Sequence, residues 1–514
     1  MQEISELSHS VVSLNKVIDK APAVLIESAK LIQNKATKAC RLFVMNDIQD
    51  NTHYFDLKKK LRDQQYEYTT EFITRQQLEK LSHIFQTSEA IEASESDKQN
   101  KILNIIKTAV DMGASDLHIE IGTFTRFLFR IDGSRVAMPQ FEQSAEEGKL
   151  LVQSLYNSMC DERSAGTFSY QEPTQGKIRE EYVKPFGLST GRLASRPGSA
   201  GGVIVVIRLI SRRRQSNTLQ ELGVQPEEEK VIRRALAKPA GVILSSGPTG
   251  HGKSTLSQAM AEIYAAENPG MNPISVEDPI ESPIEGVFQT PLIITERHDG
   301  QKMGQAWAKA ISNLMRLDPD AIYIGEVRDS TSGNGVIEAA QTGHIGITTI
   351  HTNHPIDILQ RLRRWGVDQD LLTDATLITC LIGLRLVKKL CPSCKRSYRD
   401  HRHTVDALFH EVIDKYTKTD GVFLINPAGC DDCNHTGIKG RTGVFEVIET
   451  DSKFMRLYES KGKFAAYDYW RKNINGVTLT ENAIRLINEG VIDPVITHKS
   501  ICNLDRDEKF YEQD

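Results

Sequence analysis

The clearest hydrophobic pattern lies between Gly241 and Ile350, where short apolar runs alternate with segments whose apolar residues recur at helical spacing. Strands are expected at Val242–Ser245, Pro273–Glu277, Ala321–Gly325 and Ile345–Ile350. Helices are expected from the end of the first strand to about Ala265, over residues 303–317, and near Val336–Thr342. Strands alternating with helices favour a parallel sheet covered on both faces. Residues 226–390 are therefore predicted to be an α/β core.

A different pattern precedes this core, in residues 96–211. Apolar residues between Ile102 and Val110 recur at helical spacing, and a second helix is expected around Glu146–Met159. Strands are expected at Leu117–Glu120, Arg126–Ile131 and Val203–Ile210, with hairpin-turn chemistry at Asp132-Gly133. The mixture predicts a separate α+β domain.

Residues 1–95 are helix-rich in character and carry no readable motif, so a helical N-terminal docking region is expected. The polar stretch Ser88–Gln99 is interpreted as a linker. A second linker is expected at residues 212–225, because Ser211–Asn217 is polar and basic. Contact of this basic run with nucleic acid or lipid is the less favoured alternative.

Composition places the protein in a broad class. The chain has 514 residues, of which 39% are apolar and 25% charged, and a net charge of −5. Its length suggests roughly three or four domains, and its charge gives no global reason to expect nucleic-acid binding. The sequence has no apolar run of the roughly 20 residues that cross a bilayer, and it opens without a secretory signal. A cytoplasmic protein with only peripheral membrane contact is expected.

A phosphate-binding loop is indicated directly after the first core strand. The segment Gly247-Pro248-Thr249-Gly250-His251-Gly252-Lys253-Ser254-Thr255 matches G-x-x-x-x-G-K-[ST]. Its glycines let backbone N–H groups converge on phosphate oxygens, and the following helix adds its positive end. Lys253 is expected to neutralise the β- and γ-phosphates and Ser254 to bind Mg²⁺. His251 is expected to be a surface residue of the loop.

Hydrolysis also needs a group that activates water. Glu326 follows an apolar strand, at the edge of a parallel sheet where ligands bind, and is predicted to polarise the attacking water, supported by Asp329. Glu277 ends another strand and is expected to reach metal-bound water, with Glu281 as a less certain neighbour.

Two histidines bracket the last core strand, His344 before it and His351 after it. Both are interpreted as sensors of the γ-phosphate, on the assumption that they share the edge that carries the other motifs. A purely structural role is the alternative for each.

Four of the eight cysteines form two C-x-x-C pairs, Cys391/Cys394 and Cys430/Cys433. Two such pairs converging on one ion make a tetrahedral thiolate site, for which zinc is the expected metal. A redox pair would need only one C-x-x-C. Residues 391–437 are therefore predicted to be a zinc-binding insertion, and the other four cysteines to be buried thiols.

These motifs together resemble the secretion ATPase superfamily, the motors of type II secretion, type IV pili and type IV secretion. Its Walker A, acidic, Walker B and histidine segments occur in family order at Gly247–Thr255, Ile274–Glu281, Leu314–Asp329 and Ala340–Asn353. The resemblance implies a RecA-like core that hydrolyses ATP with Mg²⁺, preceded by an α+β (PAS-like) domain. It also implies a homo-hexamer acting on an inner-membrane platform protein, with residues 438–514 as the helical end of the ATPase domain.

The resemblance also gives a role to arginines of the α+β domain, which in such motors close over the nucleotide. Arg192 and Arg208 match them by position. Residues 196–202 depart from the family's usual turn, so Arg196 or Arg130 could share the role. A guanidinium suits developing phosphate charge, and the alternative is a surface arginine on a strand.

The cysteine quartet is similar to an insertion in type II secretion and pilus extension ATPases, which favours the assembly branch, and a type IVb pilus is the narrower guess. Basic residues nearby are interpreted mainly as solvated faces and subunit contacts, with docking to an acidic loop or anionic lipid as the alternative: Arg361, Arg363, Arg364, Arg385, Lys388, Lys389, Lys395, Arg396, Arg399 and Arg402.

The sequence thus predicts a cytoplasmic, hexameric ATPase at the inner membrane that powers type IV pilus assembly or type II-like secretion. A DNA-translocating or conjugation-linked type IV secretion motor is the alternative. The acidic net charge and the lack of interleaved aromatic and basic residues disfavour it, and no nucleic-acid partner is expected. A non-hydrolysing scaffold is disfavoured by intact Lys253, Ser254 and Glu326.

Overall fold

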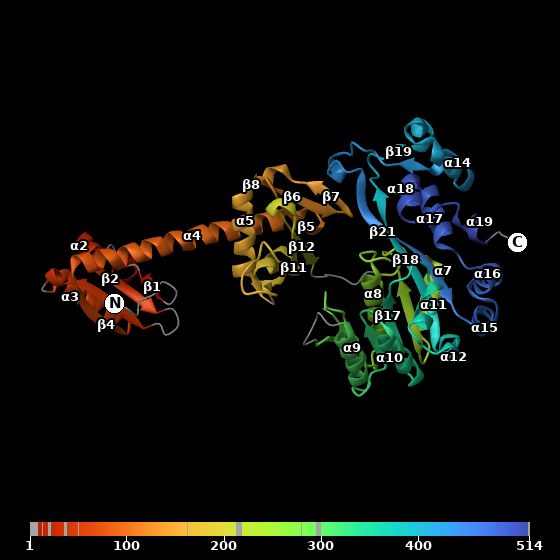
Figure 1. The fold of residues 1–514 in the computed structure, drawn as a ribbon, viewed down its shortest axis with the longest axis horizontal. Helices are drawn as coiled ribbons and strands as arrows, with labels where there is room; N and C mark the ends of the chain where they lie inside the picture. The colour runs from red at the N-terminus through yellow and green to blue at the C-terminus, as the bar shows by residue number, and fades with distance from the viewer. Residues whose placement is uncertain are drawn as a thin grey trace.

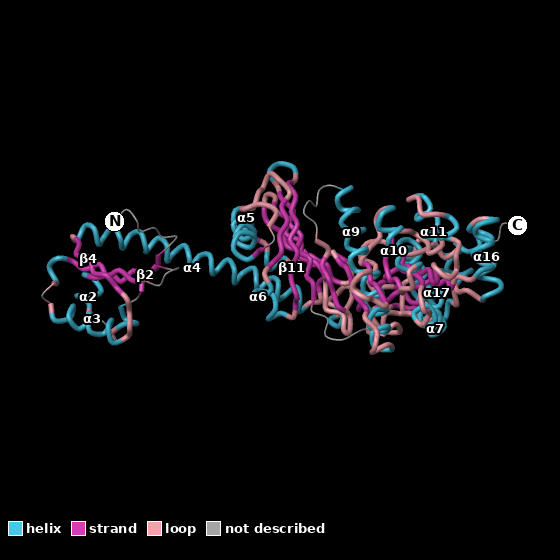
Figure 2. Tube along the Cα trace, turned by 90° about the horizontal axis from the view of Figure 1, so that it is seen from below, coloured by secondary structure: helices cyan, strands magenta, loops and turns pink. Residues whose placement is uncertain are grey.

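The computed structural model describes residues 9–511, apart from 13, 19–21, 35–38, 50, 162, 212–217, 279 and 294–299. Three bodies follow one another along the long axis of the molecule, from a small N-terminal domain to a large C-terminal one (Figure 1). A single long helix, α4 (Arg75–Asp111), joins the first body to the second, as the perpendicular view also shows (Figure 2).

The N-terminal body is a mixed α/β domain, so the prediction of a helical region is wrong. Its sheet has the order β1-β2-β3-β4. The elements are β1 (His9–Val12), α1 (Leu14–Val17), α2 (Ala23–Ser28), β2 (Ala29–Asn34), β3 (Cys40–Met45), α3 (Thr52–Asp63) and β4 (Tyr68–Ile73). Leu31, Leu42 and Val44 from the strands pack with Leu57 and Leu61 of α3. A strand of six residues is too short for its pattern of apolar residues to distinguish it from a buried helix by sequence alone.

The predicted linker at Ser88–Gln99 lies inside α4, so that prediction is also wrong. The helix has no glycine or proline along its 37 residues and is rich in strong helix formers. Its start is fixed by a capping box in which Thr74 and Gln77 satisfy each other's backbone N–H groups. Polar composition therefore did not mark a loss of helical structure here.

The second domain confirms the α+β prediction. Its sheet runs β7-β6-β5-β12-β11-β10-β9, with β8 paired to β6. The strands are β5 (Ala114–Ile121), β6 (Phe124–Ile131), β7 (Ser134–Ala137), β8 (Gln143–Ser144), β9 (Cys160–Asp161), β10 (Thr174–Ile178), β11 (Leu188–Pro197) and β12 (Val203–Ser211). The end of α4 and helix α5 (Ala145–Ser154) pack on its apolar face, through Ile102, Ile106 and Leu151 among others. Helix α6 (Glu180–Val183) is a short turn before β11.

The α/β core holds a seven-stranded sheet of order β15-β14-β16-β17-β13-β18-β21, parallel except for the edge pair β18 and β21. The strands are β13 (Gly241–Ser246), β14 (Pro273–Glu277), β15 (Phe288–Pro291), β16 (Ala321–Ile324), β17 (Ile345–Ile350), β18 (Ile378–Leu390) and β21 (Ile438–Glu449). The helices are α7 (Pro226–Leu236), α8 (Lys253–Glu267), α9 (Gly300–Leu314), α10 (Ser330–Gln341), α11 (Asp357–Arg364) and α12 (Gln369–Leu372).

Helices cover both faces of this sheet, as predicted. Along β13, Val242 and Leu244 join the apolar cluster beneath α9, α10 and α11, while Ile243 between them joins the cluster beneath α7 and α8. Successive strand residues point to opposite faces of the sheet, so one strand contributes side chains to the apolar clusters on both faces. This is the parallel α/β architecture expected of a RecA-like core.

The cysteine insertion separates β18 from β21. It contains β19 (Arg396–Ser397), α13 (Tyr398–His401), α14 (Ala407–Tyr416) and β20 (Phe423–Leu424). The segment predicted to be helical after it begins with a strand of the core sheet, β21, and continues as α15 (Ser452–Lys461), α16 (Lys463–Ile474), α17 (Leu479–Asn488), α18 (Pro494–Ser500) and α19 (Arg506–Tyr511). Among the described residues, helices fall short of the length and apolarity that a membrane span requires.

Candidate functional site

The phosphate loop lies where predicted, between β13 and α8, at the carboxyl edge of the sheet. Gly250 and Gly252 adopt φ values of 78° and 90°, which glycine accepts without steric cost. Gly247 is required for a different reason: a Cβ there would lie 2.5 Å from the carbonyl oxygen of Leu384 on β18. The loop is therefore packed closely on the neighbouring strand, with the first amides of α8 directed to its mouth.

Lys253 is buried, with 7% of its surface exposed. Its Nζ donates to the carbonyl oxygens of Gly247, at 2.9 Å, and Pro248, at 3.1 Å. Burial lowers the pKa of this ammonium from its ordinary value, and the nearby carboxylate of Glu326 opposes that change. Thr249, Ser254 and Thr255 line the same cleft.

His251 is not the surface residue that was expected. Its Nδ1 accepts a hydrogen bond of 3.0 Å from the backbone N–H of Leu386 on β18. Burial lowers the pKa of its imidazole. The side chain thus attaches the loop to β18, and it is not among the residues that line the cleft.

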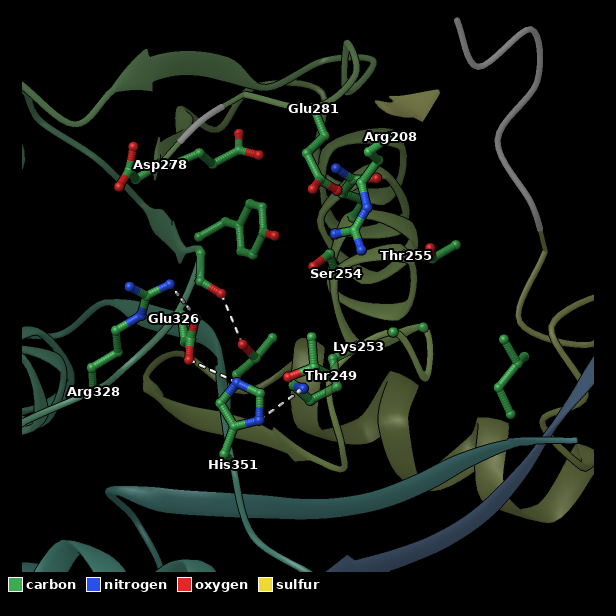
Figure 3. A pocket seen from close by; sticks show the side chains of 18 of the residues that line it. Arg208, Thr249, Lys253, Ser254, Thr255, Asp278, Glu281, Glu326, Arg328 and His351 are labelled. Carbon is green, nitrogen blue, oxygen red and sulfur yellow. Dashed lines mark hydrogen bonds and ion pairs between the residues drawn. The ribbon is translucent and has the colours of Figure 1, made fainter. Parts of the chain in front are cut away.

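The cleft has a volume of about 430 Å³ and lies between the second domain and the core. In Figure 3, Arg208 and Glu281 stand on one side, Glu326, Arg328 and His351 on the other, and Lys253 between them. Because these side chains come from five different segments, the fold concentrates charge of both signs around the phosphate loop.

Glu326, which follows β16, faces His351, which follows β17. One carboxylate oxygen of Glu326 lies 2.8 Å from His351 Nε2, and the other lies 2.9 Å from the Arg328 guanidinium. Lys253 Nζ lies 3.4 Å from His351 Nδ1. Burial and Lys253 lower the pKa of His351. Since an ammonium can only donate, Nδ1 of the neutral ring accepts from Lys253 and Nε2–H donates to Glu326.

Glu277, at the end of β14, is buried and lines the cleft. Its Oε1 accepts hydrogen bonds from Ser275, at 2.7 Å, and Gln289, at 2.8 Å. Burial raises the pKa of this carboxyl, and the two hydrogen bonds partly oppose the rise.

Asp329 does not contact Glu326 in any hydrogen bond or ion pair of the described residues. Its Oδ1 instead accepts from the backbone N–H of Ser332, at 2.8 Å, and caps α10. The predicted support of Glu326 by Asp329 therefore has no contact behind it in the described residues. Capping of α10 explains the acid at this position.

The assumption that His344 and His351 share one edge is also wrong. The carbonyl oxygen of His344 accepts from Gly241, at the start of β13, whereas His351 follows the carboxyl end of β17. Six strand residues separate the two edges by about 20 Å. The His344 imidazole lies at the end of α10, with Nδ1 3.0 Å from the Ala339 carbonyl oxygen, so it does not reach the phosphate loop of its own subunit.

Of the two predicted arginines, Arg208 on β12 reaches the cleft, whereas Arg192 on the adjacent strand β11 does not line it. Arg208 lines the cleft, and its Nε lies 3.2 Å from Asp116, which Arg130 approaches from the other side at 3.8 Å. Arg192 pairs with Arg208 across β11 and β12 and is not among the lining residues. Arg196 lies four residues farther along β11.

Sequence reasoning missed Arg441, which lines the cleft from β21. Its segment was assigned to the helical end of the ATPase domain, and nothing in the local sequence marks Arg441 as part of the cleft. Pairing of β21 with β18 carries it beside the phosphate loop. Gln258, Trp307 and Tyr323 line the cleft as well. They lie within predicted helices or an apolar strand, so the sequence did not indicate that they belong to the site.

The second domain also touches the core directly. Asp132, in the turn between β6 and β7, accepts from the backbone N–H of Gly440 at 2.9 Å. Lys388 of β18 donates to Ser134 at 2.6 Å. These contacts hold the turn at the root of the cysteine insertion.

The four predicted metal ligands, Cys391, Cys394, Cys430 and Cys433, do converge, with all four sulfurs within 4.8 Å of one another. The separations Cys391–Cys430, Cys394–Cys433 and Cys430–Cys433 are 3.8, 3.9 and 3.8 Å. A tetrahedron with Zn–S bonds of about 2.3 Å has S···S edges of about 3.8 Å. Backbone N–H groups of Cys430 and Gly437 donate to Cys433 Sγ, which favours a thiolate. The donor set fits zinc.

A family model for type II/IV secretion system proteins matches residues 92–501. The protein transport protein HofB homolog of Escherichia coli K12 is 31% identical over 427 residues, covering 81% of this chain and 85% of that protein. The type II secretion system ATPase E of Vibrio cholerae is 30% identical over 413 residues, covering 79% and 76%. The type IV pilus assembly ATPase PilB of Acinetobacter baylyi is 28% identical over 393 residues, covering 76% and 64%.

Solved structures show the same fold. The ATPase DotB of Legionella pneumophila aligns with a TM-score of 0.52 at 18% identity, covering 77% of this chain and 94% of that one. The pilus retraction motor PilT aligns with a TM-score of 0.50 at 22% identity, covering 76% and 94%. Because the family model spans most of the chain and takes in the phosphate loop, Glu326 and the four cysteines, this protein belongs to the type II/IV secretion system protein family, the secretion ATPases.

Proposed function

We propose that this protein hydrolyses ATP in the cleft between its second domain and its core, and that this powers type IV pilus assembly or type II-like secretion. The observation that carries the proposal is the hydrogen-bonded chain from Lys253 through His351 to Glu326. It links the phosphate-binding lysine to the carboxylate best placed to activate water.

Binding of the triphosphate rests on the loop amides, on the first turn of α8 and on Lys253. When bound, Mg²⁺ would neutralise charge on the β- and γ-phosphate oxygens. The hydroxyl of Ser254 and the carboxylates of Glu277 and Asp278 in the same cleft are hard oxygen donors of the kind it prefers.

In the proposed reaction the Glu326 carboxylate accepts the proton of the attacking water. Neutral His351 donates its Nε2–H to that carboxylate, which keeps it ionised and oriented. Arg208 and Arg441 enter the cleft from the second domain and from β21, and are suited to stabilise charge on the transferred phosphoryl group. Since Arg208 belongs to another domain, its engagement would couple hydrolysis to domain closure.

We further propose that the protein works as a homo-hexamer at the cytoplasmic face of the inner membrane, reached through a platform protein. The names of its relatives, a type II secretion ATPase and a pilus assembly ATPase, support this branch. The cysteine cluster would hold structural zinc, since all four ligand positions are filled by protein. His344 and Arg192 lie outside the cleft, so a role for either would need a neighbouring subunit.

The test of hydrolysis is steady-state ATP turnover by the full chain with Glu326→Gln. Loss of the general base predicts a fall in kcat of roughly 100- to 10,000-fold, with nucleotide affinity within about threefold because the phosphate loop is untouched. Glu411→Gln, an exposed glutamate on α14, is the matched control and should turn over normally. Wild-type turnover by Glu326→Gln would show that another group activates water.

The test of the motor role is the assembly state and the bound partners in the native cell. A hexamer in the presence of a slowly hydrolysed ATP analogue, recovered with an inner-membrane platform protein and pilin-like subunits, is expected. Recovery of DNA with a relaxase, together with DNA-stimulated turnover, would instead assign the protein to a nucleic-acid motor.

A further inference from the structure

The loop that carries His351 is held in place at two successive residues by buried arginines. Asn353 offers its carbonyl oxygen to Arg385 of β18, at 2.8 Å. His354 offers Nδ1 to Arg506 of α19, at 2.6 Å. Within the loop, the Thr352 hydroxyl donates to the His354 carbonyl oxygen at 2.8 Å. The residues between β17 and α11 thus have little freedom to move independently of these two arginines.

Both arginines belong to the interior of the domain. Arg385 is 9% exposed and Arg506 is 7% exposed. Arg385 had been interpreted as part of a solvated or subunit-facing basic surface, and its burial corrects that view. Its second contact is the carbonyl oxygen of Leu384, at 3.0 Å, the same atom that limits Gly247 to glycine. Arg385 therefore holds the His351 loop on the same strand that packs against the phosphate loop.

Arg506 is anchored in turn by Glu446 of β21, which is fully buried and lies 3.7 Å from it. Glu446 also accepts from the backbone N–H of Leu479, at the start of α17, at 3.0 Å. A buried carboxylate of this kind compensates the charge of a buried guanidinium. The C-terminal helices thus hold Arg506 in a defined position.

The protonation state of His354 agrees with this arrangement. Burial and the adjacent Arg506 lower the pKa of its imidazole to about 4, so the ring is neutral near pH 7. A neutral Nδ1 facing a guanidinium can only accept, which makes Arg506 the donor of this hydrogen bond. The link is therefore one donor to one acceptor, and removal of either partner breaks it.

We propose that Arg506 is a positioning residue for hydrolysis: through His354 it fixes the loop of residues 351–354, and so holds His351 against Glu326. The C-terminal helix α19 thereby becomes part of the apparatus that sets the turnover rate, although none of its residues is among the described ones that line the cleft. This inference rests on the proposed role of Glu326 as the base. A displacement of about 1 Å at a reacting group can cost roughly 100-fold in rate.

The experiment compares kcat and KM for ATP in the full chain carrying Arg506→Gln, His354→Ala or both. We expect each single substitution to lower kcat by about 10- to 100-fold and to leave KM within about twofold, because the contacts of Lys253 with the carbonyl oxygens of Gly247 and Pro248 are unchanged. The double substitution should cost no more than the larger single one, because both break the same link. Lys509→Gln, an exposed residue on the same helix, is the control and should be neutral.

Multiplied losses in the double variant, or an unchanged kcat in His354→Ala, would overturn the proposal. If Arg506→Gln leaves Glu446 uncompensated and the chain does not fold, His354→Ala alone decides, since it leaves the Arg506–Glu446 pair intact. Failure of the proposed function would look different: wild-type protein would not turn over ATP, or Glu326→Gln would turn over at the wild-type rate.

Discussion

Glu228 offers a quantitative test of the electrostatics that join α7 to the C-terminal helices. Its side chain is in the first turn of α7, and the residue is 7% exposed. One carboxylate oxygen accepts from the backbone N–H of Gln225, at 2.9 Å, and the other from Asn482 of α17, at 2.8 Å. Burial raises the pKa of this carboxyl from 4.5 to about 7, with Glu446 adding to the rise and these hydrogen bonds and Arg485 opposing it.

The sign of the effect on stability follows from proton binding. Between pH 4.5 and about 7 the folded protein holds a proton on Glu228 that the unfolded chain releases. Its contribution to stability is therefore fully present below pH 4.5 and is lost as the pH rises through about 7. With these two pKa values, the free energy of unfolding should fall by about 2.5 kcal/mol from this group between pH 5 and pH 8.

The substitution Glu228→Gln removes the titration and keeps the shape. Its amide loses one acceptor, a cost that does not vary with pH, whereas the penalty of burying a carboxylate disappears. The melting temperature of the variant relative to wild type should therefore rise by on the order of 4 °C between pH 5 and pH 8. Thermal unfolding followed by circular dichroism at constant ionic strength measures this difference.

Glu227→Gln is the matched control, because that neighbouring carboxylate is exposed and its ion pair within the described residues is with Lys230 on the same helix. It should show the same pH dependence as wild type. If the melting curves of Glu228→Gln also remain parallel to those of wild type from pH 5 to pH 8, burial does not hold a proton on Glu228 and the reasoning fails.

Three further outcomes are expected. Lys253→Ala should weaken ATP binding by at least about tenfold, since a charge-assisted contact is worth about 1.5–3 kcal/mol; isothermal titration measures it, and unchanged affinity would contradict the assigned role. Cys430→Ser should lower bound zinc by elemental analysis and expose the insertion to protease, whereas Cys40→Ser should keep the metal. Asp132→Ala, which removes the contact with Gly440, should leave KM for ATP nearly unchanged but accelerate proteolysis between the domains, and an unchanged cleavage rate would show that this contact does not hold them.

Short-range motifs were the most predictable part of this protein. The glycine spacing from Gly247 to Gly252 determines the loop by itself, because the required backbone conformations and the following helix are set by consecutive residues. The two C-x-x-C pairs likewise specify a four-cysteine cluster, since each pair forms half of it locally. The alternation of strands and helices in the core was equally predictable, because the helices that flank the core strands have apolar residues at clear helical spacing.

Relations between distant segments were not predictable in the same way. The strand β17 was located correctly, yet His344 and His351 were placed on one edge because sequence proximity was taken for spatial proximity. A strand has a direction, and its two ends lie on opposite edges of the sheet. The prediction for the N-terminal domain was wrong for a related reason. Its short strands are stabilised by pairing with one another, which the local sequence does not show.

The amino-acid sequence by itself determined that a phosphate loop, a carboxylate at the end of a strand and a four-cysteine site exist in a parallel α/β protein. Tertiary structure alone decided what lies around the cleft and the loops that line it: Arg208 from another domain, Arg441 from β21, and the buried Arg385 and Arg506 behind the His351 loop. The physical reason is that local spacing sets backbone conformation, whereas the neighbours of a side chain depend on strand order and register across the whole sheet.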